Sequence, residues 1–325
     1  MTDIKAFGER VIENLEKVII GKRDAIELIV IGLLCQGHIL IEDVPGVGKT
    51  MLARSLARSL DCAFNRIQFT PDMLPSDVTG ISIYNQQKAK FEFRPGPIIG
   101  QIILADEINR ATPKTQAALL EAMEERQVTV DGVTHALPLP FMVLATQNPI
   151  EYEGTFPLPE AQLDRFLLRV RLGYPDYTDE IKILDSQRLK HPIDSLKSVA
   201  KAKDVLDASE AIRSVFVSPA AKRYVTDLTR RTRQSGDIYL GASPRGTLAL
   251  SRAAQARAAL SGRTYILPDD VKDVAVAVLG HRIIVSPAAR LRELSADRIV
   301  QEIMHNTPVP GGEFLAAPAA DKKSK

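Results

Sequence analysis

The feature that most constrains the fold of this chain is a glycine-rich turn placed directly after a short apolar strand. Residues 38–41 (HILI) predict the strand, and residues 45–50 (PGVGKT) form the turn. Glycines at this spacing let successive backbone N–H groups point at phosphate oxygens, and the N-terminus of the helix that follows adds positive potential. Strand, phosphate-binding turn and helix together predict the first unit of an α/β fold with a parallel sheet.

This turn is predicted to bind a nucleoside triphosphate. Lys49 is expected to reach the β- and γ-phosphates, and the Thr50 hydroxyl to bind Mg²⁺. The general form of the motif begins with glycine, whereas this chain has Asp43, which must tolerate the backbone conformation of that position. The residues expected to bind the nucleotide are Val44, Pro45, Gly46, Val47, Gly48, Lys49, Thr50 and Met51.

A second motif, residues 102–107 (IILADE), predicts a buried strand that delivers two carboxylates at its end. Asp106 is expected to hold Mg²⁺, directly or through water. Glu107 is expected to orient or deprotonate the attacking water. A strand that ends in solvated acids is common when it stands alone, so the prediction rests on the pairing of this strand with the phosphate-binding turn.

Three further residues are candidates for catalysis. Asn148 ends a strand in residues 145–149 (ATQNP) and could position the water near the γ-phosphate, although asparagine before proline is also a frequent turn. Arg165 and Arg245 stand at ordered breaks, and arginines of this kind stabilise charge on a transferring phosphoryl group. Spacing alone supports them weakly, because an arginine is usually a surface residue.

The pattern of short apolar runs and helical periodicity predicts an α/β core followed by an all-helical domain. Two insertions interrupt the core: a strand pair at 79–84 and 90–94, and a hairpin at 127–137 built around Asp131–Gly132. After residue 173 the sequence pattern predicts helices, and Ser-Pro pairs mark the expected first residues of some of them. We therefore expect a core at residues 1–189, a helical domain at 190–310 and a disordered tail at 311–325.

Composition excludes several classes of function. The net charge of +2 gives no broad basic field, so nucleic acid is not expected as a partner. The two cysteines and five histidines show no metal-ligand spacing. The N-terminus lacks the apolar core of a signal peptide, and the longest apolar run, residues 28–35, is too short to cross a bilayer. We expect a cytoplasmic protein without membrane insertion.

The order of these motifs resembles that of the AAA+ ATPases, and longer stretches closely resemble the MoxR family within them. Those stretches are residues 67–77 (IQFTPDMLPSD), 93–97 (FRPGP), 105–110 (ADEINR) and 159–166 (PEAQLDRF). The resemblance covers about residues 8–310. It implies an AAA+ fold with a P-loop parallel sheet and an all-α lid domain, in which the strand pair is the helix-2 insert and the hairpin precedes sensor 1.

By that resemblance, each of the three catalytic candidates takes a role. Asn148 is the sensor-1 residue, Arg165 the arginine finger that acts on a neighbouring subunit's ATP, and Arg245 the sensor-2 residue. The adenine lies near residues 18–21, and Asp43 matches members of this family. The family is also implicated in chaperone-like maturation of proteins with a von Willebrand factor A domain, often with metal-centre assembly. These analogies imply a homo-oligomeric ring, expected to be a hexamer.

Three alternatives stay open at this stage. The chain could be the ATPase subunit of a metal chelatase, which shares both insertions, or a DNA-associated AAA+ motor. The hairpin at 127–137 contains no Lys or Arg, whereas the other insert has Lys88, Lys90 and Arg94, so a salt-dependent affinity for nucleic acid would decide on the motor. The third alternative is a binding scaffold that is controlled by nucleotide and rarely hydrolyses ATP. The sequence does not name the client or the ring size, and it leaves open whether metal insertion is involved and whether Arg165 and Arg245 act in cis or in trans.

Overall fold

The computed structural model describes residues 3–149, 154–188 and 190–310, which divide into two compact units. The first unit, the core unit, contains residues 7–209. The second, the lid unit, contains residues 3–6 together with 210–310. The compact units therefore divide after Ser209, and the boundary expected after residue 189 stays a prediction. The tail predicted at 311–325 lies outside the described residues.

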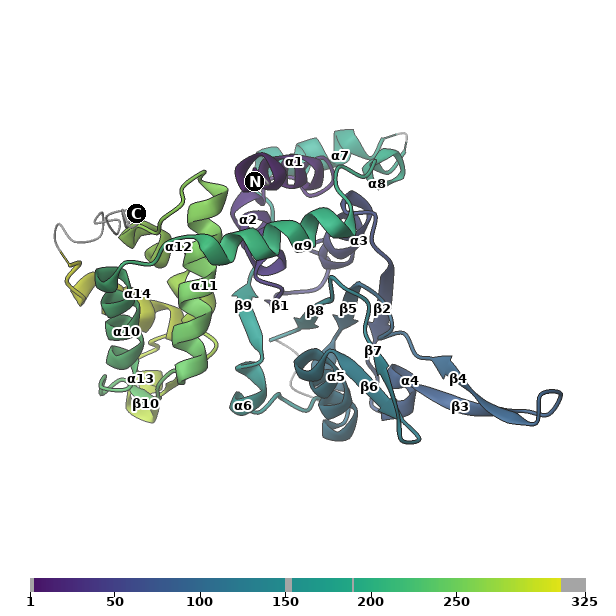
Figure 1. Ribbon diagram of the computed structural model, residues 1–325. Coiled ribbons are helices and arrows are strands. Elements are labelled where there is room, and N and C mark those ends of the chain that lie inside the picture. The colour runs from purple at the N-terminus through teal and green to yellow at the C-terminus, as the bar shows by residue number, and fades with distance from the viewer. Residues whose placement is uncertain (1–2, 150–153, 189, 311–325) are drawn as a thin grey trace, which may run out of the picture. The chain divides into compact units, whose positions relative to one another are not determined.

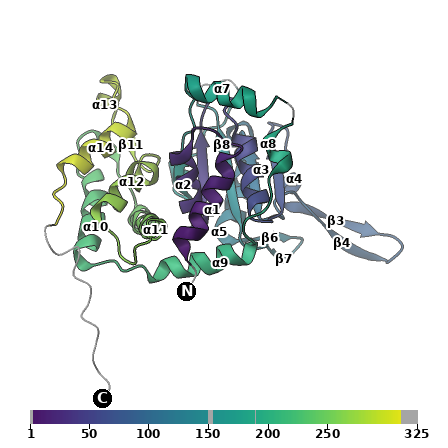
Figure 2. The same cartoon turned by 90° about the horizontal axis from the view of Figure 1, so that it is seen from above.

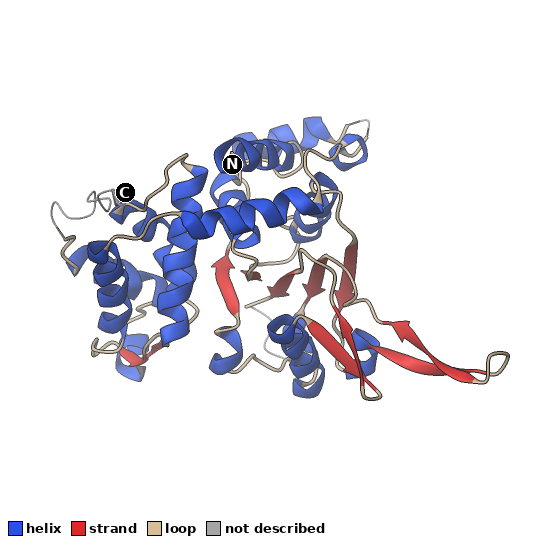
Figure 3. Ribbon diagram, in the orientation of Figure 1, coloured by secondary structure: helices blue, strands red, loops and turns tan. Residues whose placement is uncertain are grey.

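A five-stranded parallel sheet forms the centre of the core unit (Figure 3). Its strands run in the spatial order β2-β5-β8-β1-β9, and every neighbouring pair is parallel. All five occupy apolar runs that predict strands in the sequence, and no end differs from the prediction by more than one residue. The predicted runs are residues 38–41, 65–69, 101–105, 141–146 and 166–171. The strands are β1 (His38–Glu42), β2 (Phe64–Gln68), β5 (Ile102–Asp106), β8 (Met142–Gln147) and β9 (Phe166–Val170).

Both faces of this sheet are covered by helices, which explains why the strands are apolar throughout. Figure 1 shows α1 (Ile4–Glu16), α2 (Arg23–Leu34) and α3 (Lys49–Ser59) on one side and α5 (Pro113–Glu125) on the other. Leu40 belongs to the apolar cluster that includes Met123 of α5. Its neighbour Ile39 faces α2, where a Cβ on Gly32 would lie 2.7 Å from the Ile39 Cδ1 atom. Successive residues of β1 thus enter two separate cores.

His38, the first residue of β1, is a buried imidazole held between β8 and the end of α5. Its Nδ1 atom accepts a hydrogen bond from the Val143 backbone N–H at 3.0 Å. Its Nε2 atom lies 3.0 Å from the Met123 carbonyl oxygen. Since an amide can only donate, the single proton sits on Nε2. Burial lowers the pKa of His38 from its ordinary 6.5 to about 4, and the charge of Arg126 acts in the same direction.

We expect the free energy of unfolding to fall as the pH drops from about 6.5 to about 4, in part because of His38. In this window the unfolded imidazole binds a proton and the folded one does not, so acid favours the unfolded state. The contribution is complete above pH 6.5, and its loss amounts to about 2–3 kcal/mol. Urea unfolding of the wild type and of His38→Gln, at about pH 7 and about pH 4.5, measures it. An equal loss in both proteins would contradict the assignment.

Two hairpins leave the core unit on the side of α5 (Figures 1 and 2). The first joins β3 (Gly80–Asn85) to β4 (Lys90–Pro95), and the second joins β6 (Gln127–Val130) to β7 (Val133–Ala136). Both were predicted. The second turns at Asp131 and Gly132, whose φ values of 50° and 78° are those of a two-residue hairpin loop. The Phe93 and His135 rings stack with centroids 3.8 Å apart, so the two hairpins contact each other.

Shorter elements complete the core unit. The segment before β3 is α4 (Pro75–Thr79), and a 3₁₀ turn, η1 (Ile108–Arg110), follows β5. The remaining helices are α6 (Glu160–Leu163), α7 (Tyr177–Ser186), α8 (Pro192–Ser195) and α9 (Ala202–Ala211), the last of which runs into the lid unit.

The lid unit is built from helices whose starts were largely readable from the sequence. Ser218 and Ser243 accept hydrogen bonds from backbone N–H groups in the first turns of α10 (Pro219–Thr232) and α11 (Pro244–Leu260), as the Ser-Pro pairs predict. The other elements are η2 (Ile212–Ser214), α12 (Pro268–Leu279), α13 (Pro287–Leu291), α14 (Ala296–Asn306), and a small antiparallel pair, β10 (Ile238–Leu240) and β11 (Ile284–Val285). The sequence analysis did not predict α14 or this strand pair.

Candidate active site

The order of the strands brings the three sequence motifs of the core unit to one edge of the sheet. β5, β8 and β1 are adjacent and parallel, so the residues that follow their carboxyl ends lie side by side. Asp106 ends β5, Asn148 follows β8, and residues 43–50 follow β1. The Asp43 backbone N–H donates to the Gln147 carbonyl at 3.2 Å, which joins the start of the glycine-rich turn to the end of β8.

The turn has the backbone conformation that its glycines suggest. Gly46 and Gly48 have φ values of 85° and 90°, in the left-handed region that other residues rarely adopt. A Cβ on Gly46 would meet nothing within 4 Å, so the requirement there is conformational and not steric. Gly48 caps α3, and Lys49 and Thr50 form its first turn. The Lys49 Nζ donates to the Asp43 carbonyl at 2.8 Å, which folds the side chain back over the turn.

Asp43, the departure from the general motif, is an anchor for this turn. It is 7% exposed, and it is not among the described residues with positive φ, so position 43 does not require glycine here. Its Oδ2 atom accepts the backbone N–H groups of Leu172 at 2.6 Å and Gly173 at 2.7 Å. Its Oδ1 atom accepts the N–H of Val44 at 2.9 Å. The carboxylate therefore fastens the start of the turn to the segment after β9.

Asp106 is 8% exposed as a whole residue, and its carboxylate is held by two donors. The Thr146 hydroxyl, on β8, donates to Oδ1 at 2.6 Å. The Arg66 guanidinium, on β2, donates to Oδ2 through Nη2 at 2.5 Å and Nε at 3.1 Å. One oxygen is thus fixed by a neutral group and the other by a cation.

Glu107 begins the turn after β5 with a φ of 57°, which is uncommon for a residue other than glycine. Its backbone N–H donates to the Thr146 hydroxyl at 2.8 Å, so the same threonine fixes both acids. Its Oε2 atom accepts from the Gln68 side chain at 2.8 Å and pairs with the Arg110 Nε at 3.1 Å. With this left-handed backbone, the Glu107 side chain reaches Gln68 at the end of the neighbouring strand β2.

The sequence analysis missed the four side chains that hold the two acids: Arg66, Gln68, Arg110 and Thr146. Arg66 and Gln68 alternate on β2, whose register places Gln68 beside Asp106. That register is not visible in the sequence. Thr146 lies inside the motif from which Asn148 was chosen, and Asn148 itself is 5% exposed at the end of β8.

Arg165 lies at the other end of the sheet from the glycine-rich turn. It precedes β9, whose first residue, Phe166, pairs with His38 at the start of β1. The turn begins only after the last residue of β1, and five residues of strand span about 16 Å, farther than an arginine side chain reaches. The Arg165 Nη1 donates to the Leu120 carbonyl at 2.6 Å, and its Nε lies 4.0 Å from Glu124. The structure therefore does not bring Arg165 to the turn of its own chain.

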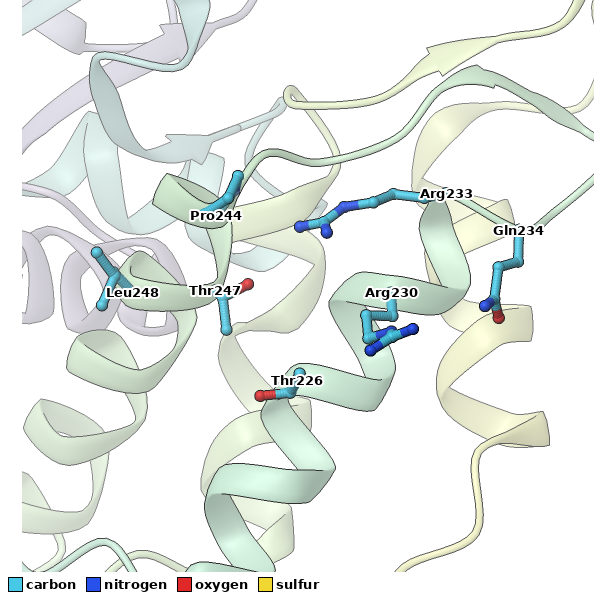
Figure 4. A pocket seen from close by; sticks show the side chains of 7 residues that line it. All are labelled: Thr226, Arg230, Arg233, Gln234, Pro244, Thr247 and Leu248. Carbon is cyan, nitrogen blue, oxygen red and sulfur yellow. The ribbon is translucent and has the colours of Figure 1, made fainter.

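Arg245 belongs to the lid unit, where it is the second residue of α11. Its backbone N–H donates to the capping Ser243 hydroxyl at 3.1 Å, and the residue is exposed. A cavity of about 600 Å³ lies beside this helix start, and Figure 4 shows the side chains that line it. The cavity is lined by Thr226, Arg230, Arg233 and Gln234 from α10 and the residues just after it, and by Pro244, Thr247 and Leu248 from α11. None of the predicted site residues lines it.

The described residues contain neither a candidate metal site made of protein side chains alone nor a candidate membrane span. Among residues 3–149, 154–188 and 190–310, no group of three or more His, Cys, Asp or Glu could hold a metal ion by itself. No helix in those ranges is long and apolar enough to cross a membrane.

Comparison with known protein families agrees with this geometry. The profile of the ATPase family associated with various cellular activities (AAA) matches residues 38–168, from the start of β1 into β9. The profile of the AAA lid domain matches residues 230–303, within the lid unit.

Individual relatives match over nearly the whole chain. The chain is 52% identical to the uncharacterized protein YeaC of Bacillus subtilis, over 95% of this chain and 96% of that protein. It is 40% identical to Chaperone MoxR1 of Mycobacterium tuberculosis, over 93% and 82%. It is 30% identical to Protein MoxR of Methylorubrum extorquens, over 95% and 97%. The crystal structure of a candidate ATPase from Cytophaga hutchinsonii superposes with a TM-score of 0.87 at 39% identity, over 95% and 97%.

Proposed function

This chain belongs to the MoxR family of AAA+ ATPases and hydrolyses ATP, and from that premise we propose that it works as a magnesium-dependent hexameric ring that remodels client proteins. The observation that carries the proposal is the meeting of the glycine-rich turn, Asp106, Glu107 and Asn148 at one edge of the sheet, with Arg165 at the opposite end. In such a chain the arginine proposed as the finger lies away from the turn of its own chain, where a second chain can supply it.

The proposed metal site fits the residues present. Thr50 contributes a hydroxyl from the first turn of α3, and Asp106 contributes a carboxylate at the end of β5. Mg²⁺ prefers oxygen ligands and keeps several waters, so two protein oxygens together with phosphate oxygens are sufficient. When bound, the ion neutralises charge on the β- and γ-phosphates.

Each of the remaining site residues has a proposed role at the nucleotide. The backbone of residues 44–51 and the Lys49 ammonium bind the phosphates. Glu107 orients the attacking water and accepts its proton, and Asn148 fixes the water through its amide. Arg245, from the lid unit, acts as the sensor-2 residue. We assign these roles on the strength of the family and of the positions described above.

Arg165 is proposed to act on the ATP of the neighbouring subunit. The length of β1 between Arg165 and the turn of the same chain supports action in trans. Because a guanidinium stabilises the charge of the transition state, hydrolysis then depends on assembly. A hexamer with identical head-to-tail contacts supplies one such arginine to every site.

The clients are proposed to be proteins that contain a von Willebrand factor A domain, matured in the cytoplasm, in some cases together with a metal centre. The surface that supports client contact is the pair of hairpins, which expose large apolar side chains. Those side chains are Ile81, Ile83, Tyr84, Phe91 and Val133. Such apolar surface on projecting strands suits a protein partner, and the β6–β7 turn has no Lys or Arg with which to bind nucleic acid.

The ATPase rate per subunit, measured against protein concentration with and without a purified von Willebrand factor A domain protein, tests this function. We expect the rate per subunit to rise with concentration as rings form, and to change further when the partner is added. Sedimentation with ATP establishes whether assembly is already complete at the lowest concentration. A flat rate across a range in which the mass increases would contradict the shared site.

A further inference from the structure

A single side chain of β2, Arg66, links the two acids of the proposed hydrolysis site. Its Nη2 atom donates to Asp106 Oδ2 at 2.5 Å and also to Gln68 Oε1 at 2.6 Å. The Gln68 amide in turn donates to Glu107 Oε2 at 2.8 Å. A continuous chain of hydrogen bonds therefore runs from the acid proposed to hold the metal to the acid proposed to orient the water.

The position of Arg66 follows from the strand pairing. β2 and β5 are parallel with Arg66 opposite Leu104 and Gln68 opposite Asp106, so Arg66 and Gln68 project from the same face of β2. The Asp106 side chain is 11% exposed and that of Arg66 is 46% exposed. The acid is thus fixed in the protein, whereas the cation has room to move into solvent.

The contacts of Arg66 use the oxygen that a metal would need. Thr146 already donates to Asp106 Oδ1, and Arg66 approaches Oδ2 with two of its nitrogens. A divalent cation and a guanidinium repel each other, and Mg²⁺ demands near-ideal octahedral geometry that a second cation on the same oxygen would disturb. Mg²⁺ and the Arg66 guanidinium therefore cannot both bind Asp106 Oδ2 with optimal geometry at the same time.

We propose that Arg66 is an internal counter-ion that competes with Mg²⁺ for Asp106 and thereby couples metal loading to the position of Glu107. In the arrangement described here Arg66 neutralises Asp106 and holds Gln68, which holds Glu107. With a metal bound at Asp106, the Arg66 guanidinium would leave Oδ2, and Gln68 would lose the donor to its Oε1 atom. Arg66 acts through Asp106 and Gln68 and is a positioning residue. This inference rests on the proposed Mg²⁺ site at Thr50 and Asp106.

The test measures how tightly the full-length protein binds a divalent cation in the presence of ADP. Mn²⁺ is the probe, and electron paramagnetic resonance detects its binding. We expect Arg66→Ala to bind Mn²⁺ about three- to tenfold more tightly than the wild type, because no cation has to leave. Arg66→Lys, which keeps the charge and cannot bridge Asp106 and Gln68 in the same way, should lie between them. The same ranking is expected for the Mg²⁺ concentration that half-saturates ATP hydrolysis.

Arg54→Ala is the matched control, since it removes one positive charge from an exposed position on α3. Its cation affinity should equal that of the wild type. Unchanged or weaker Mn²⁺ binding by Arg66→Ala would overturn the inference, because Arg66 would then support the metal or be indifferent to it. If thermal melting shows that Arg66→Ala does not fold, Arg66→Lys decides, and an affinity equal to the wild type overturns the proposal. If the wild type binds no Mn²⁺ in the presence of ADP, the proposed metal site at Thr50 and Asp106 is refuted. That result counts against the proposed function and is distinguishable from a failure of the inference about Arg66.

Discussion

Replacing Glu107 with glutamine should leave ATP bound and lower the rate of its hydrolysis by about 10²- to 10⁴-fold. Glutamine keeps the size of the side chain and can still bond to Gln68 and Thr146 through the same positions, so the fold should be preserved. It cannot accept the proton of the attacking water. Phosphate release in a single turnover measures the chemical step, and retention of labelled ATP on a filter measures binding.

Lys49→Ala is the companion variant for this measurement. Lys49 lies at the start of α3, beside the phosphate-binding backbone, and its removal should weaken both nucleotide binding and turnover. The two variants therefore separate binding from chemistry. ATP hydrolysis by Glu107→Gln at the wild-type rate would show that the protein does not depend on this acid, as expected of a nucleotide-gated scaffold. Unaltered nucleotide binding by Lys49→Ala would refute the proposed nucleotide site.

Replacing Arg165 with alanine should lower ATP hydrolysis about 10³-fold in the assembled protein while nucleotide affinity changes little. The reason is that Arg165 is proposed to touch only the charge that develops at a neighbour's γ-phosphate. Its own contacts, with the Leu120 carbonyl and Glu124, lie at the far end of the sheet. Arg165→Lys, which retains a charge, controls for loss of those contacts, and steady-state kinetics with an independent binding assay separates kcat from affinity.

Mixing two inactive variants distinguishes an arginine that acts in trans from one that acts in cis. Lys49→Ala subunits keep Arg165 and lack a working turn, whereas Arg165→Ala subunits have the opposite defect. When the two are mixed, a neighbour can supply the missing arginine, and part of the activity should return. Mixtures that assemble, as seen by sedimentation, and stay inactive would show that Arg165 does not serve the adjacent site.

The parts of the fold that local sequence determines were predictable. The glycine-rich turn depends on two residues with positive φ, Gly46 and Gly48, and the β6–β7 loop depends on Asp131–Gly132. The helix α5 begins at Pro113, because proline fits a first helical position. In each case, residues adjacent in the sequence are sufficient to predict the local structure.

The parts that were missed depend on contacts between distant segments. Arg66 and Gln68 acquire their roles only through the register of β2 against β5, and Thr146 through the neighbouring position of β8. β10 and β11 are three and two residues long, too short for alternation to be recognised. α14 is an exception that was overlooked, because its start was readable from local sequence: Ser295 caps it by accepting the Arg298 N–H, and its apolar residues recur at helical spacing.

The stacked rings of Phe93 and His135 join the two hairpins, so a force applied to one hairpin can reach the other. β6 continues directly from the end of α5, and α5 carries the Leu120 carbonyl and Glu124 that hold Arg165. A force on the tip of the longer hairpin would therefore have a route through the Phe93–His135 contact and β6 to the helix that holds Arg165. If a client binds that hairpin as proposed, pulling on the client would act close to the residue on which the adjoining subunit's turnover is proposed to depend.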